Sequence, residues 1–189
     1  MSTARQLRYS YEDYLQTLAR SEVKLEFCAG VIYAMAGGTL THSALATRIT
    51  IALGKQLPPS CEGFNSDAKV RVEETDFAGF PDASVVCGPV QRAPSDAHAL
   101  ANPSLLIEVT SKSTEAYDRG EKLEHYQRIP ALRAVLFVSH RAQRVTLVER
   151  TDSGWSTRDF GPGERLALTV PALTLSVDEL YDGITLDPA

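Results

Sequence analysis

One acidic residue inside an apolar run constrains the fold of this chain more than any other feature. Residues 105–109 read Leu-Leu-Ile-Glu-Val, a composition typical of a strand that is covered on both faces of its sheet. Glu108 therefore loses much of its hydration when the strand is buried. Its carboxyl group must be protonated, paired with a cation, hydrogen-bonded or bound to a metal, since an unpaired buried charge costs several kcal/mol.

The residues after this strand predict a short polar turn and then a helix. Candidate N-caps lie at positions 111–114, and the helical stretch from about 115 to 129 ends at Pro130. In a strand–turn–helix arrangement, a residue two turns into the helix can fold back toward the end of the strand, and Lys122 is at that position. The alternative is that Lys122 pairs with Asp118 on an exposed helix face, a pairing worth about 0.3–0.5 kcal/mol.

Hydrophobic periodicity elsewhere predicts a chain of mixed α and β elements in one domain over residues 1–189. We expect helices over about 11–18 and 41–57, the second capped by Thr41, and a last capping box formed by Ser176 and Glu179. A hairpin is expected over 25–35, and an irregular connection over 88–103. The other expected strands are 64–72, 83–87, 134–139, 145–149, 155–160 and 166–170.

Composition limits the function classes that need to be considered. A formal net charge of −5 argues against a protein that coats nucleic acid non-specifically, because that affinity comes from many lysine and arginine contacts to phosphate. The first residues lack the apolar segment of a secretory signal, and no apolar stretch approaches the ~20 residues that a spanning helix needs. We therefore expect a cytoplasmic protein with no membrane partner.

The three cysteines, Cys28, Cys61 and Cys87, are odd in number and far apart, and no Cys-x-x-Cys pair occurs. Neither a disulfide framework nor a structural zinc site is indicated by this spacing. We expect ordinary half-buried thiols.

Two acids and a lysine can together build a site for phosphodiester hydrolysis. Magnesium prefers oxygen ligands and keeps several waters, so the carboxylates of Asp82 and Glu108 and the backbone carbonyl of Val109 are enough to hold it, with Mn²⁺ as a substitute. A bound metal lowers the pKa of its water, and a lysine such as Lys122 can position that water or neutralise charge in the transition state.

Each of the other candidate residues has a purely structural alternative. Asp82 could serve only as a turn residue that opens a strand after Pro81. Glu26 could point to solvent from an edge hairpin, an interpretation that we favour slightly over a role as a further acid of the site. Lys69 and Lys112 are rivals to Lys122 as the cation, and both could equally be solvated.

Two histidines, His42 and His125, could assist proton transfer, although each could equally lie at a helix end or on the surface. The sequence contains no His-x-x-x-His, Gly-x-Ser-x-Gly or Gly-x-Gly-x-x-Gly motif. Zincin, serine-hydrolase and dinucleotide-binding functions therefore have no support.

As an ordered set, these motifs resemble the Uma-two family of restriction endonucleases, within the PD-(D/E)XK nuclease superfamily. The residues that carry the resemblance are Pro81-Asp82, Asn102 to Ser111 (NPSLLIEVTS), Ser113-Thr114, Tyr117 to Lys122 (YDRGEK), Tyr126, the segment Arg133 to Val138 (RAVLFV), the Leu25-Glu26 hairpin and His42. The resemblance implies a restriction-endonuclease-like fold: an α/β (α+β) domain with a central mixed sheet flanked by helices, here followed by C-terminal hairpins.

The resemblance also implies a role for each acid. Asp82 would be the motif aspartate, Glu108 the second acid, and Glu26 an additional acid from the N-terminal part. The superfamily's usual lysine two residues after the second acid is absent, because Thr110 stands there. The resemblance implies that the lysine is instead located on the helix, at Lys122.

The expected function is a metal-dependent endonuclease that hydrolyses DNA; the alternative is a catalytically silent binding or regulatory module with the same fold. We also expect a homodimer, because the C-terminal hairpins supply more apolar surface than an edge sheet normally leaves in water. The residues behind this expectation are Val135, Phe137, Val145, Leu147, Trp155 and Phe160.

Overall fold

The computed structural model describes residues 8–35, 37–111 and 113–188 and contains two mixed six-stranded sheets. The strands of the first sheet follow the order β2 (Val31–Ala34), β1 (Leu25–Cys28), β5 (Phe77–Gly79), β4 (Lys69–Val72), β8 (Asp96–Leu100) and β7 (Arg92–Ala93). The strands of the second sheet follow the order β12 (Gly154–Phe160), β11 (Val145–Thr151), β10 (Ala134–Ser139), β9 (Leu105–Thr110), β6 (Ala83–Cys87) and β3 (Cys61–Asn65). A separate hairpin joins β13 (Arg165–Thr169) to β14 (Ala172–Ser176).

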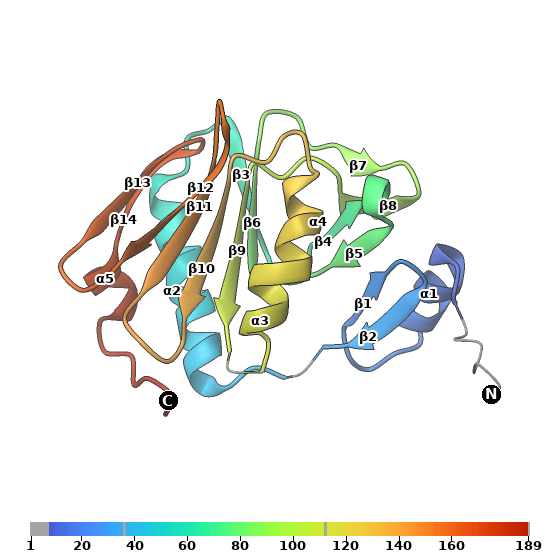
Figure 1. Cartoon of the computed structure of the whole chain (residues 1–189), viewed down its shortest axis with the longest axis horizontal. Coiled ribbons are helices and arrows are strands. Elements are labelled where there is room, and N and C mark those ends of the chain that lie inside the picture. Colours follow the sequence, from blue (N-terminus) through green and yellow to red (C-terminus); the bar gives the residue numbers. More distant parts are fainter. Residues whose placement is uncertain (1–7, 36, 112, 189) are drawn as a thin grey trace.

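Helices cover both faces of the second sheet, as Figure 1 shows. The longest, α2 (Leu40–Gln56), packs on one face with the β13–β14 hairpin and α5 (Val177–Tyr181). The other face packs against α4 (Leu123–Gln127) and the first sheet, whose outer end carries α1 (Tyr11–Leu18). Among the described residues, no helix is long and apolar enough to cross a membrane.

The strand around Glu108 is central to the second sheet. All six residues of β9 are buried, and β9 pairs parallel with β10 and antiparallel with β6. Side chains alternate between the two faces of a strand, so Ile107 and Val109 enter the core beneath α2, while Leu106 enters the core beneath α4. Glu108 has the parity of Leu106 and therefore points toward α4 and the first sheet.

The helix predicted over about 115–129 is interrupted. It consists of α3 (Glu115–Tyr117), a π-helical turn over Asp118–Lys122 and α4, with a non-helical backbone at Gly120 (φ −104°, ψ −105°). Such wide turns within helices occur frequently at functional sites. Here the turn carries Asp118 and Lys122 into the interior, where both are buried.

Three further expectations about secondary structure are wrong in detail. The strand predicted over 64–72 is two strands, β3 and β4, which belong to different sheets and are separated by a turn in which the Asn65 side chain accepts a hydrogen bond from the Asp67 N–H. The connection over 88–103 contains β7 and β8. The N-cap of α2 is Thr39 rather than Thr41, because the Thr39 hydroxyl accepts a hydrogen bond from the His42 N–H.

Two of the cysteines form a disulfide, contrary to the expectation of free thiols. Cys61 on β3 is the direct cross-strand neighbour of Cys87 on β6, with the Cα atoms 4.0 Å apart, and the two sulfurs are bonded. Sequence spacing of 26 residues could not reveal this, because only the strand register brings the residues together. Cys28 remains a free, buried thiol.

The apolar side chains that suggested a homodimer are largely buried within the chain itself. Val135, Phe137, Val145 and Leu147 are at most 1% exposed, because both faces of the second sheet are covered. The premise of an exposed apolar sheet is therefore wrong, and the homodimer stays a prediction without this support.

The cross-strand disulfide leads to a simple prediction. Alkylation of the denatured protein without reductant should modify one cysteine, Cys28, and alkylation after reduction should modify all three, as counted by mass spectrometry. Modification of all three without reductant would show that Cys61 and Cys87 are not bonded in the protein as isolated.

Candidate active site

A single buried lysine lies among three carboxylates. The Lys122 Nζ atom is 2.9 Å from Glu26 Oε1, 3.0 Å from Glu108 Oε1 and 3.7 Å from Asp118 Oδ1. The Lys122 side chain is only 3% exposed, and none of the three acidic side chains exceeds 7%. The alternative of an Asp118–Lys122 pair on an exposed helix face is therefore wrong, because both residues are buried.

Glu108 is held by two donors on the helix that follows it. Its Oε1 atom receives a hydrogen bond from the Tyr126 hydroxyl at 2.7 Å and lies beside Lys122 Nζ. Burial raises the pKa of Glu108 to about 8; Lys122 opposes this rise, while Asp82 and the other nearby carboxylates add to it.

Asp82 lies at the end of β6, next to Glu108. The β6–β9 register pairs Ala83 with Ile107, so its continuation by one residue sets Asp82 opposite Glu108. The Asp82 Oδ2 atom accepts a hydrogen bond from the Val109 N–H at 2.7 Å and lies 3.3 Å from His42 Nε2. The hydrogen bond to Asp82 raises the pKa of His42, and burial of the imidazole opposes this effect.

Glu26 reaches this site from the first sheet. It is 5% exposed, so the solvent-exposed alternative for Glu26 is wrong. Its Oε1 atom also accepts a hydrogen bond from the Phe80 N–H at 3.3 Å. A Cβ atom at Gly79 would lie 2.8 Å from that oxygen and 2.7 Å from Phe77 Cζ, so only glycine leaves room for this carboxylate.

Lys122 remains charged because of its acidic surroundings. Burial opposes its charged form, but Glu108 and the other neighbouring acids outweigh burial and raise the pKa of Lys122 well above its ordinary value. Burial also raises the pKa of Asp118, and Lys122 opposes that rise. Three carboxylates thus share one lysine, those of Glu26, Glu108 and Asp118, and Asp82 lies beside Glu108.

The structure brings together the four side chains expected from the sequence: Glu26, Asp82, Glu108 and Lys122. Of the rival cations, Lys69 forms a buried ion pair with Asp96 at 2.6 Å and is not among these acids. Lys112 lies outside the described residues.

The two histidines occupy different places. His42 contacts Asp82, whereas His125 contacts Cys28, with Nε2 3.2 Å from Sγ.

Sequence reasoning missed two members of this site, Asp118 and the hydroxyl of Tyr126. Asp118, Lys122 and Tyr126 follow one another at intervals of four residues, which places them on one face of a helix. That spacing, read together with the need of Glu108 for a donor, could have identified both.

The four acids offer oxygen atoms suited to a divalent cation. Among the described residues, no hydrogen bond uses Asp82 Oδ1 or Glu108 Oε2, while the other oxygen of each carboxylate is engaged by protein donors. Asp82 is also the most accessible of the acids, with a side chain 15% exposed. The residues present therefore fit a hard, oxygen-preferring metal such as Mg²⁺.

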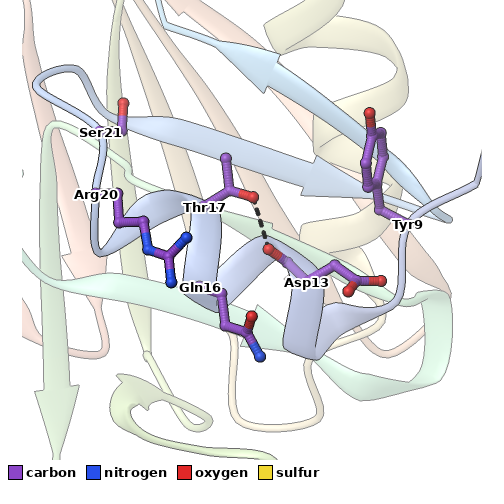
Figure 2. Close-up of a pocket in the computed structure, with 6 residues that line it drawn as sticks. All are labelled: Tyr9, Asp13, Gln16, Thr17, Arg20 and Ser21. Carbon is purple, nitrogen blue, oxygen red and sulfur yellow. Dashed lines mark hydrogen bonds between the residues drawn. The ribbon is translucent and has the colours of Figure 1, made fainter.

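A pocket of about 530 Å³ lies elsewhere, along α1 (Figure 2). It is lined by Tyr9, Asp13, Gln16, Thr17, Arg20 and Ser21. Its polar groups serve the helix itself, since Asp13 forms the capping box with Ser10 and the Thr17 hydroxyl donates to the Asp13 carbonyl. None of the four acids or Lys122 lines this pocket.

Comparison with known proteins assigns the family. Residues 11–178 match the model of the Uma2 family, described as "Putative restriction endonuclease". The chain belongs to the Uma2 family. The resemblance inferred from the sequence motifs is thereby confirmed, and every site residue discussed above lies within the matched range.

Two relatives of this Uma2 protein come from Synechocystis sp.. The chain is 36% identical to "Uncharacterized protein slr1290" over 94% of its own length and 93% of the relative's, and 30% identical to "Uncharacterized protein sll1609" over 76% and 82%.

A solved structure confirms the fold of this family member. The chain matches a "putative nuclease belonging to DUF820" from Anabaena variabilis with a TM-score of 0.72 and 18% identity, covering 92% of this chain and 98% of the other. The predicted restriction-endonuclease-like fold, with mixed sheets flanked by helices, is thereby confirmed.

The space at Gly79 gives a testable consequence. Gly79→Ala should destabilise the protein by about 1–3 kcal/mol, because the new methyl group overlaps the Glu26 carboxylate and Phe77. Gly54→Ala is the matched control, because Gly54 is exposed on α2 and a Cβ atom there would have nothing within 4 Å. Alanine at this position should increase the stability by at most about 1 kcal/mol. Urea unfolding of both variants checks this; equal stabilities would argue against the tight packing of Glu26.

The raised pKa of Glu108 predicts a pH dependence of folding. The pKa of Glu108 is about 8 in the folded protein, above its ordinary value of 4.5. Between pH 4.5 and pH 8, the folded protein therefore keeps a proton that the unfolded chain has already lost. The resulting stability is complete below about pH 4.5 and is lost as the pH rises through 8. The free energy of unfolding of the wild type, minus that of Glu108→Gln, should therefore fall by as much as about 4 kcal/mol between about pH 5 and pH 8.

Glu124→Gln is the control for this measurement, because Glu124 is an exposed glutamate of the same helical segment. Its stability should follow the wild type across the pH range. A constant difference between the wild type and Glu108→Gln at all pH values would contradict the raised pKa.

Proposed function

We propose that this protein is a Mg²⁺-dependent endonuclease that hydrolyses phosphodiester bonds in DNA. The observation that carries the proposal is that three buried carboxylates surround the single charge of Lys122, those of Glu26, Glu108 and Asp118, with the carboxylate of Asp82 beside Glu108. Buried carboxylates in excess of their cations are unfavourable without a further positive charge. A divalent metal supplies that charge.

Asp82 and Glu108 would hold the metal, with the Val109 carbonyl as a third ligand. The fit rests on the two carboxylate oxygens that no hydrogen bond among the described residues uses. When bound, Mg²⁺ lowers the pKa of a coordinated water and stabilises negative charge on a phosphoryl oxygen. Mn²⁺, with a similar preference for oxygen ligands, should substitute for it.

The chain's own groups would orient the reaction. Hydrolysis forms a bond between the water oxygen and phosphorus and breaks one phosphorus–oxygen ester bond; the water loses a proton and the leaving oxygen gains one. Lys122, fixed by Glu26 and Glu108, presents a permanent positive charge toward the developing charge on the phosphate. Glu26 acts as a positioning residue, because its carboxylate contacts the lysine rather than the reacting atoms.

The choice of DNA as substrate follows from the family, whose description names a restriction endonuclease. A homodimer, by analogy with restriction-type folds, and the cytoplasmic location expected from the sequence complete the proposal. The acidic net charge of −5 predicts that any nucleic-acid contact is local and salt-sensitive rather than spread over the surface.

Cleavage of plasmid DNA in the presence of Mg²⁺ or Mn²⁺ tests the proposal. Glu108→Gln and Asp82→Asn should abolish cleavage and weaken metal binding measured by titration calorimetry. Lys122→Met should leave metal binding largely intact but lower turnover by about 10²-fold or more, since lysine is not a ligand.

Lys112→Ala serves as the control, being the rival lysine nearest to Glu108 in the sequence. It should cleave DNA as the wild type does. If Lys112→Ala abolished cleavage while Lys122→Met retained it, the lysine would be misassigned. Metal binding that depends on Asp82 and Glu108 without cleavage of DNA or RNA would favour the silent binding module.

A further inference from the structure

A second group of chemically reactive side chains lies next to the acidic site. Cys28 of β1, Glu121 of the π turn and His125 of α4 have ligand atoms within 4.8 Å of one another. The Cys28 Sγ atom is 3.4 Å from Glu121 Oε1 and 3.2 Å from His125 Nε2. None of the three side chains has a part in the proposed hydrolysis.

The two separations that involve the Cys28 sulfur are close to the edges of a tetrahedral zinc site. With Zn–S near 2.3 Å and Zn–N or Zn–O near 2.0–2.1 Å, tetrahedral ligands lie about 3.5 Å apart. The separations of 3.2 and 3.4 Å are shorter than this by only a few tenths of an ångström. Small rotations of the side chains would therefore place a metal among them.

The surrounding structure orients these ligands. The His125 ring stacks on Phe77, with centroids 4.7 Å apart and planes 8° from parallel, while its Nε2 atom lies beside the Cys28 sulfur. Glu121 and His125 are four residues apart and so share one helix face. Cys28 is buried but Glu121 is exposed, so a metal can enter from solvent on the Glu121 side.

We propose that Cys28, Glu121 and His125 bind a borderline-soft divalent cation, Zn²⁺ or Co²⁺, at a site separate from the magnesium site. A thiolate selects such metals, whereas the oxygen ligands of Asp82 and Glu108 suit Mg²⁺ or Mn²⁺. The thiol proton of Cys28 passes to solvent when the metal–sulfur bond forms. Water occupies the fourth coordination position.

The site would also reinforce the acidic cluster. Cys28 and Glu26 lie two residues apart on β1 and thus on the same face, and Glu121 precedes Lys122 in the chain. A metal that joins Cys28 to Glu121 and His125 would cross-link β1 to the π turn and α4. It would thereby fix the distance between Glu26 and Lys122.

Titration of the full-length protein with Co²⁺ tests the proposal through the thiolate-to-cobalt charge-transfer absorption in the near ultraviolet. The wild type should develop this band with one equivalent of metal, even with excess Mg²⁺ present. Cys28→Ser should lose the band. His125→Gln should weaken Co²⁺ binding by roughly 100-fold or more, because losing a ligand should reduce affinity at least as much as losing a residue that only supports a ligand. Asp82→Asn and the double variant Cys61→Ser/Cys87→Ser should keep the band, since neither alters this site.

Three results would overturn the proposal: no band in the folded wild type, a band that survives Cys28→Ser, or a band lost in Cys61→Ser/Cys87→Ser alone. The titration of the wild type tests the proposal even if the Cys28→Ser variant does not fold. Because the readout is absorption by bound Co²⁺, it is independent of nuclease activity. Failure here would leave the proposed hydrolysis untouched, and failure of cleavage would leave this site untouched.

Discussion

The positive charge of Lys122 inside the protein is the interaction on which the arrangement of the site depends. Its ammonium group lies within 3.0 Å of acids from both large sheets, Glu26 on β1 and Glu108 on β9. Removing one member of such a buried set leaves an uncompensated charge, which typically costs 3–5 kcal/mol. The lysine thus couples the packing of the two sheets to the chemistry of the acids between them.

Part of this site could be predicted from the sequence because burial and charge conflict visibly there. An acid within an apolar strand requires a partner, and the strand–turn–helix order limits where that partner can lie, so Lys122 was one of a few candidate lysines for Glu108. The burial of Glu26 was harder to predict, because the sequence of a short hairpin does not indicate whether its strands lie at the edge of a sheet. Its burial arises from packing against the helical segment after β9, a tertiary contact with no local pattern.

The remaining differences share the same cause. Gly120 interrupts the helical segment that follows β9, and the Cys61–Cys87 bond depends on the register of β3 against β6. The apolar C-terminal strands are covered from both sides by elements distant in sequence, so they gave a misleading indication of exposed surface. Local propensity predicted most elements, whereas their partners were set by topology.

The central claim is that Asp82 and Glu108 together form a metal site beside Lys122. Anomalous diffraction from crystals soaked in Mn²⁺ tests it most directly, because the peak locates the ion without requiring turnover. The account predicts one strong peak in contact with the carboxylates of Asp82 and Glu108, and its loss in Asp82→Asn. A peak only at other residues, or none at saturating Mn²⁺, would contradict it.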